Sequence, residues 1–186
     1  MVHENDGLTV PNVSFKYRVR TDGFPITHVN TENGSENPFE WQEVTSSEIF
    51  DDRRVVVFSL PGAFTPTCSG MQLPSLEALY DDFKAKGIDE VYCLSVNDSF
   101  VMNAWAKEHD IENVKMIPDG SGEFTRDMDM LVFKPFQNFG YRSWRYAMIV
   151  NDMEVEKMWV EDGKNQMGLD SDPYENTKPD DILNSL

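Results

Sequence analysis

The chain has few cysteines and few basic residues. Its 186 residues include only Cys68 and Cys93, too few for a disulfide framework and typical of a reducing compartment such as the cytoplasm. Lysine and arginine number 16 against 33 acidic residues, which gives a net charge of −17. The basic residues are scattered, so none of them forms a track for phosphates. We therefore expect a cytoplasmic protein that does not bind nucleic acid.

Long apolar stretches are also missing. No segment approaches the ~20 apolar residues of a transmembrane helix, and the N-terminus lacks the basic and apolar regions of a secretory signal. His3, His28 and His109 lie far apart, and no group of potential ligands has the spacing of a metal site. These absences argue against a membrane partner, a bound metal and a Cys–His hydrolase.

Apolar residues are nevertheless sufficient for one core. Hydrophobic residues make up 40% of the chain and aromatic residues 12%, which suits a single domain spanning residues 1–186. Residues 1–50 are polar and rich in turns, with a candidate strand at 13–20 and a loop at 30–41. This part is expected to form an N-terminal strand and loop extension.

From residue 55 onward, predicted strands and helices alternate. The strands cover 55–60, 91–96 and 114–119. The helices cover 66–86, 100–109, 121–130 and 177–186, and either Asp98 or Ser99 caps the second of them. A hairpin over 146–160 is expected to turn at Asn151-Asp152. Pro74 should kink the first of these helices near Ser69 and Gly70. A βαβ unit followed by a hairpin predicts an α/β protein with a mixed sheet flanked by helices, the plan of the thioredoxin fold.

The most informative segment is VVVFSLPGAFTPTC, residues 55–68, in which a buried strand leads into a helix. Thr65 is a good N-cap and Pro66 suits the first helical position, so Cys68 should lie in the first turn. Free N–H groups and the positive end of the helix dipole favour a thiolate there. The pattern predicts a nucleophilic cysteine.

This segment resembles the active-site motif of peroxiredoxins, which are thiol peroxidases of the thioredoxin superfamily. Pro61, Thr65 and Cys68 match the motif Pro-x-x-x-Thr-x-x-Cys. The stretches PGAFTPTCS, LSVND and GYRSWRYAMIV are similar to those of the type II, peroxiredoxin-V-like subfamily. The resemblance extends from about residue 8 to the C-terminus.

The resemblance implies roles for individual residues. Cys68 would be the peroxidatic cysteine, Thr65 would hydrogen-bond the thiolate and a peroxide oxygen, and Pro61 would shield the sulfur from solvent. Arg145 would be the active-site arginine, since its fork of donors suits both the thiolate and the departing oxygen. Arg142 would be a second, supporting arginine.

The surrounding loop has implied roles as well. Backbone N–H groups from Gly62 onward would hold the peroxide, with Phe64 in a supporting position. The resemblance also suggests a homodimer through the face near the active-site loops, using Phe64, Phe136 and Phe139. Neither a metal nor an organic cofactor is expected, because the reaction needs only thiols and a peroxide.

Regeneration of the cysteine is the point that the sequence leaves open. Some plant members of the subfamily have a second cysteine at the spacing of Cys93, which acts as resolver, whereas a strand that is apolar on both faces favours a buried structural thiol. Residues 158–177 contain no other resolving cysteine. An external thiol, glutathione with glutaredoxin, is therefore favoured. The alternatives are a two-cysteine enzyme recycled by thioredoxin and a non-catalytic binding module with an unreactive Cys68.

Overall fold

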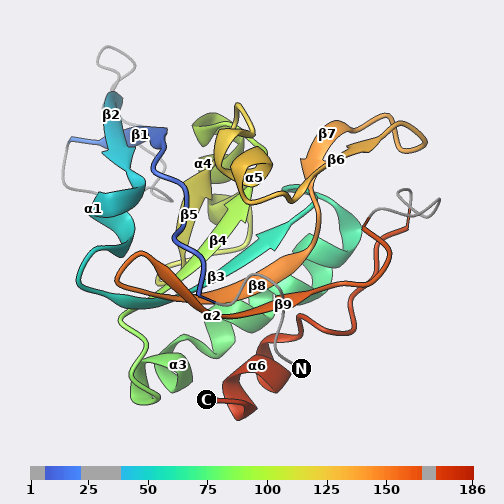
Figure 1. Cartoon of the computed structure of the whole chain (residues 1–186). Coiled ribbons are helices and arrows are strands. Elements are labelled where there is room, and N and C mark those ends of the chain that lie inside the picture. Colours follow the sequence, from blue (N-terminus) through green and yellow to red (C-terminus); the bar gives the residue numbers. More distant parts are fainter. Residues whose placement is uncertain (1–6, 22–38, 165–170) are drawn as a thin grey trace.

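The computed structural model describes residues 7–21, 39–164 and 171–186 (Figure 1). A five-stranded sheet with the strand order β5-β4-β3-β8-β9 lies at the centre. β4 is parallel to β3 and to β5, β8 is antiparallel to β3, and β9 is antiparallel to β8. These strands are β3 (Arg54–Leu60), β4 (Glu90–Ser95), β5 (Lys115–Pro118), β8 (Tyr146–Asn151) and β9 (Glu154–Val160). The predicted mixed sheet is confirmed.

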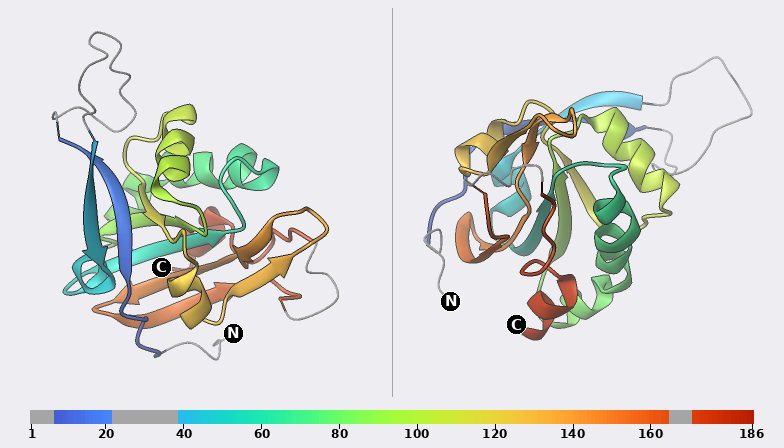
Figure 2. Two further views of the ribbon diagram at one scale, coloured as in Figure 1. Left: turned by 90° about the horizontal axis from the view of Figure 1, so that it is seen from above. Right: turned by 90° about the vertical axis from the view of Figure 1, so that its right-hand side faces the viewer.

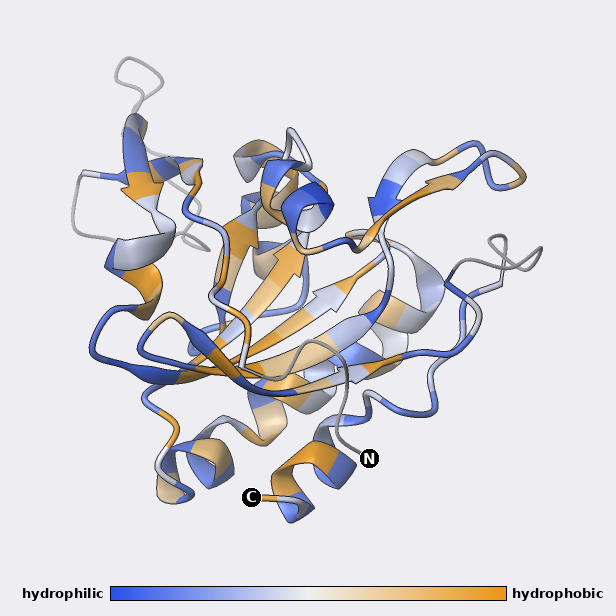
Figure 3. Cartoon of the chain, in the orientation of Figure 1, coloured by the Kyte–Doolittle hydropathy of each residue, from blue (hydrophilic) through white to orange (hydrophobic). Residues whose placement is uncertain are grey.

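Both faces of this sheet are covered. Along β3, Val55 and Val57 belong to one hydrophobic cluster, whereas Val56 and Phe58 belong to another on the opposite face. Because both faces are buried, the central strands are continuous apolar runs, coloured orange in Figure 3.

The two faces have different covers (Figure 2). β1 (Ser14–Arg20), α1 (Ser46–Phe50) and α5 (Glu123–Asp127) supply residues to the first cluster. The second cluster receives residues from four helices, namely α2 (Leu73–Ala78), α3 (Tyr80–Ala85), α4 (Ser99–Glu108) and α6 (Pro179–Asn184). Cys68 and Cys93 both lie in this second, helix-covered cluster.

The N-terminal extension is a two-stranded antiparallel sheet. β1 pairs with β2 (Phe39–Thr45), and the predicted strand at 13–20 is confirmed. The loop expected at 30–41 is wrong for residues 39–41, because they continue the ladder opposite Arg18 and Arg20. The guanidinium groups of these arginines lie over the rings of Trp41 and Phe39. Residues 30–38 of that expected loop lie outside the described residues.

The predicted helix over 66–86 is present, but its form changes twice along the chain. Cys68–Gln72 form a π-helical turn, η1, in which the Leu73 N–H donates to the Cys68 carbonyl. Pro74 has no N–H with which to continue the ordinary ladder to Gly70, and this explains the wider turn. The distortion expected after the cysteine therefore takes the form of η1. Leu79, at ψ 5°, separates α2 from α3.

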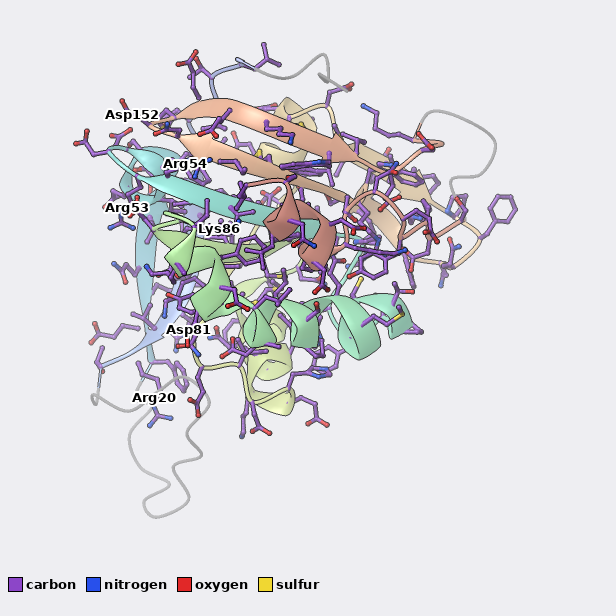
Figure 4. All side chains as sticks on the ribbon, turned by 90° about the horizontal axis from the view of Figure 1, so that it is seen from below. Arg20, Arg53, Arg54, Asp81, Lys86 and Asp152 are labelled. Atoms are coloured by element: carbon purple, nitrogen blue, oxygen red, sulfur yellow. The ribbon has the colours of Figure 1, made fainter. Side chains whose placement is uncertain are left out.

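The hairpin of β8 and β9 turns one residue later than predicted. Asn151 pairs with Glu154, so the loop is Asp152-Met153, and both loop residues have a positive φ, as in a type I′ turn. The Asp152 N–H donates to the Arg53 carbonyl at 2.9 Å, which ties the turn to the start of β3 (Figure 4). The opposite end of β3 leads to Cys68.

The remaining helices and strands follow the predictions closely, with one addition. The strands at 55–60, 91–96 and 114–119 are confirmed, as are α4, α5 and α6. Asp98 caps α4 by accepting from the Val101 N–H at 3.0 Å. The hairpin of β6 (Leu131–Lys134) and β7 (Gly140–Ser143), which leads the chain to Arg145, was not predicted from the sequence.

Candidate active site

A tight loop connects the end of β3 with Cys68. Pro61 and Gly62 are buried in it, and Phe64 has a φ of 62°, a left-handed value that is uncommon for a residue with a side chain. The Thr65 hydroxyl donates to the Gly62 carbonyl at 2.7 Å. The expected side-chain cap is not among the hydrogen bonds of the described residues. Because a hydroxyl has two lone pairs, Thr65 can still accept a hydrogen bond from a ligand.

The geometry brings Cys68 and Arg145 together from distant parts of the sequence. Arg145 Nη1 lies 3.5 Å from Cys68 Sγ, and the two residues are 1% and 0% exposed. Burial lowers the pKa of Arg145, but the nearby charges of Cys68 and Asp172 more than offset this, so the pKa of the guanidinium is raised. The cation is therefore permanent. The pairing predicted from the sequence is present in the structure.

Three further side chains that contact Arg145 were not predicted from the sequence. Gln72 Oε1 accepts from Nη1, Asp172 accepts from Nη2, and the guanidinium carbon lies 5.3 Å from the centre of the Tyr174 ring. Gln72 follows Cys68 by four residues, a spacing that places both on one face of a helix and would have identified it. Asp172 and Tyr174 belong to an irregular segment whose sequence has no comparable signal.

Arg142 lies beside the active-site loop, and it donates its hydrogen bonds to backbone carbonyls. A Cβ atom on Gly62 would lie 3.3 Å from Thr65 Cγ2 and 3.4 Å from Arg142 Nη1, so the absence of a side chain allows this close packing. Arg142 donates to the carbonyls of Val96 and Phe139, both at 3.2 Å. Burial lowers its pKa. Among the described residues, its hydrogen bonds connect loops and do not reach the sulfur.

Cys93 lies in a different environment. It is 0% exposed in the middle of β4, where it pairs with Phe58 on one side and Met116 on the other. Burial raises its pKa, and the thiol stays protonated at neutral pH. Cys68 and Cys93 are both free. The arrangement agrees with the structural role that the strand pattern favoured.

A small pocket lies next to the loop. Its volume is 210 Å³, large enough for a small molecule but not for a peptide. The active-site loop, the segment from 134 to 139 and Asp172 form its walls. The lining residues are Pro61, Thr65, Pro66, Thr67, Lys134, Gln137, Phe139 and Asp172. The described residues contain no group of three or more His, Cys, Asp or Glu side chains able to hold a metal ion.

Comparison with known proteins gives the family. The redoxin family model matches residues 21–177. A peroxiredoxin of Sinorhizobium fredii, y4vD, is 52% identical over 177 residues, which cover 95% of this chain and 89% of that protein. The chain belongs to the peroxiredoxin family. The hybrid peroxiredoxin hyPrx5 of Haemophilus influenzae is 50% identical over 147 residues, which cover 79% of this peroxiredoxin but 59% of the relative.

Solved structures agree with this assignment. The antioxidant protein of Plasmodium falciparum, a 1-Cys peroxiredoxin, superposes with a TM-score of 0.84 at 36% identity, covering 98% of both chains. Reduced Prx3 of Vibrio vulnificus in complex with H2O2 gives a TM-score of 0.77 at 31% identity, covering 100% of this chain and 96% of that one. The peroxiredoxin described here therefore has the thioredoxin fold and is a peroxidase, an oxidoreductase. None of its described helices is both long and apolar enough to span a bilayer.

Proposed function

We propose that this peroxiredoxin reduces hydrogen peroxide and alkyl hydroperoxides through Cys68, and that glutathione with glutaredoxin restores the thiol. The observation that supports the site is the 3.5 Å contact between Arg145 Nη1 and Cys68 Sγ in a buried environment. A permanent cation at this distance stabilises the thiolate and the negative charge that develops on an oxygen beside it.

The chemical step needs only the thiolate and the peroxide. The Cys68 sulfur attacks one peroxide oxygen, so an S–O bond forms while the O–O bond breaks. The bonding electron pair leaves with the other oxygen, which takes up a proton and departs as water or an alcohol. Cys68 is thereby oxidised to a sulfenic acid, which a thiol can reverse. The proposal includes no metal and no organic cofactor.

The loop residues have supporting roles in this proposal. The Thr65 hydroxyl accepts a hydrogen bond from the incoming peroxide while it donates one to the Gly62 carbonyl. The buried Pro61 keeps water from the sulfur, and the 210 Å³ pocket that it lines gives a small peroxide a path inward. Arg142 keeps this loop in place through its contact with Gly62.

Regeneration by an external thiol is supported by the state of Cys93. A fully buried thiol with a raised pKa is a poor nucleophile, because the thiolate is the attacking form. Glutathione would condense with the sulfenic acid and release water, and a second thiol would exchange with the mixed disulfide. The glutathione-rich cytoplasm would supply both thiols.

Mass spectrometry under non-reducing conditions tests this route. The protein is treated with one equivalent of hydrogen peroxide and then with glutathione. We expect a glutathione adduct on Cys68. In a steady-state peroxide assay, turnover should be faster with glutathione and glutaredoxin than with thioredoxin. A Cys68–Cys93 disulfide that thioredoxin reduces would establish the two-cysteine enzyme instead. This second candidate is favoured by one observation, which is that both cysteines belong to one hydrophobic cluster.

The proposal also includes a homodimer. Phe64 is 53% and Phe136 80% exposed on loops beside the site, and apolar side chains exposed to this extent favour an interface. Phe139 is half-buried and lines the pocket beside the active-site loop. Light scattering should give the mass of two chains for the native protein and of one chain for Phe136→Asp. A monomeric native protein would contradict this part of the proposal.

A further inference from the structure

The orientation of Arg145 depends on a segment that follows it at a distance in the sequence. Arg145 Nε donates to the Pro173 carbonyl at 3.0 Å, and Nη2 makes an ion pair with the Asp172 carboxylate. Nη1 is thereby left to face Cys68 and Gln72. A guanidinium is planar, so two fixed nitrogens determine where the third one points. The groups that bind Arg145 Nε and Nη2 come from residues 171–177, which we call the strap.

The strap is itself held by a buried carboxylate. Glu161 is 2% exposed, and its Oε1 accepts from the N–H groups of Glu175, Asn176 and Thr177 at 2.9 to 3.0 Å. The Thr177 hydroxyl donates to the same oxygen at 2.8 Å. Hydrogen bonds to a charged acceptor in a buried place are strong. The strap is therefore tied to the end of β9, independently of its contacts with Arg145.

The aromatic ring of the strap also contacts the cation. The centre of the Tyr174 ring lies 5.3 Å from the Arg145 guanidinium carbon, within the range of a cation–π interaction. Burial raises the pKa of Tyr174 to about 12, so its hydroxyl stays neutral at physiological pH. Arg145 thus lies between the strap on one side and the sulfur with Gln72 on the other.

From this arrangement we propose that Asp172 is a positioning residue for the peroxidase reaction, holding the Arg145 fork so that Nη1 faces Cys68. The inference rests on the proposed roles of Cys68 and Arg145. Asp172 does not touch the sulfur, and its side chain is 37% exposed. In this proposal its effect passes through the guanidinium. Because Asp172 also lines the 210 Å³ pocket, its variants must be tested for a direct effect on peroxide access as well.

The experiment measures the second-order rate constant for oxidation of the reduced, full-length protein by hydrogen peroxide. We expect Asp172→Ala to lower it by about 10- to 100-fold, the size expected for one hydrogen bond to a charged group. Asp172→Asn keeps an oxygen acceptor and should recover part of the rate. Glu175→Gln is the matched control, since it removes an acid of the same strap whose carboxylate pairs with Lys178 at the surface. The rate constant of this control should stay within about twofold of the native value.

A double-mutant cycle separates positioning from a general loss of structure or from blocked access. In an Arg145→Ala background, Asp172→Ala should change the rate constant by less than about twofold, because its only route of action is gone. A full Asp172→Ala effect in that background, or a native rate in the single variant, would overturn the inference. If the native protein oxidised no faster than Cys68→Ser, the proposed function would fail as well. An active native protein with an unaffected Asp172→Ala would refute the positioning role alone.

Discussion

The two cysteines are equally buried but lie in very different surroundings. Cys68 is at the start of a π-helical turn, 3.5 Å from a cation whose charge is permanent. Cys93 is in the middle of a central strand, and burial raises its pKa. Both side chains belong to the same hydrophobic cluster. Exposure therefore does not distinguish them, and the position along the sheet does.

The two sulfur environments differ because Cys93 lies within a strand and Cys68 lies beyond the end of one. Within β4 the backbone N–H groups are used by the ladders to β3 and β5, so apolar side chains surround the Cys93 sulfur. Beyond the end of β3 the chain leaves the ladder, and Arg145 lies beside Cys68 together with Gln72 of the same π-helical turn. The proposed nucleophile thus lies beyond the end of a central strand, whereas the core thiol lies within one.

The largest effect is expected from exchanging each cysteine for serine. Cys68→Ser should lower the rate of peroxide consumption by at least about 10³-fold, because the proposed nucleophile is lost. Cys93→Ser should keep the rate within about twofold when glutathione and glutaredoxin are supplied. A steady-state peroxide assay measures both. Loss of turnover in Cys93→Ser would show that the two thiols work as a pair.

A smaller but still large effect is expected at Arg145. Arg145→Ala should slow the oxidation of Cys68 by about 10²- to 10³-fold, as for other donors aimed at a developing oxyanion. Arg142→Ala should cost no more than about tenfold, because its hydrogen bonds go to backbone carbonyls and only order the loop. Stopped-flow oxidation by hydrogen peroxide gives both rate constants. Equal losses in the two variants would mean that Arg142 also acts at the sulfur.

The smallest effect concerns stability and the ionisation of Cys93. Its folded-state pKa is raised, so its contribution to the free energy of unfolding is complete below the ordinary thiol value of 9.0 and falls as the pH rises above it. In a Cys68→Ser background, the stability difference between Cys93 and Cys93→Ala should be smaller by about 1.4 kcal/mol at pH 10 than at pH 8. Urea unfolding at both values measures it. A difference that does not change with pH would place Cys93 outside the core.

Some parts of the fold could be predicted and others could not. The strands of the central sheet and the capped helix α4 were predictable, because long apolar runs and caps are local signals. β2 and the β6–β7 hairpin were missed, since their pairing partners decide their conformation. The turn at Asp152-Met153 was placed one residue early, because the register of a ladder is set by both strands.

By itself, the sequence determined that Cys68 follows a buried strand and begins a helix, since the residues responsible are contiguous from 55 to 68. It also indicated Arg145 through its resemblance to a family. Only the tertiary structure decided that Asp172 and Tyr174 contact this arginine and that Cys93 lies deep in the core. Asp172 and Tyr174 meet Arg145 through the path of the chain after β9, and no spacing in the sequence records that path.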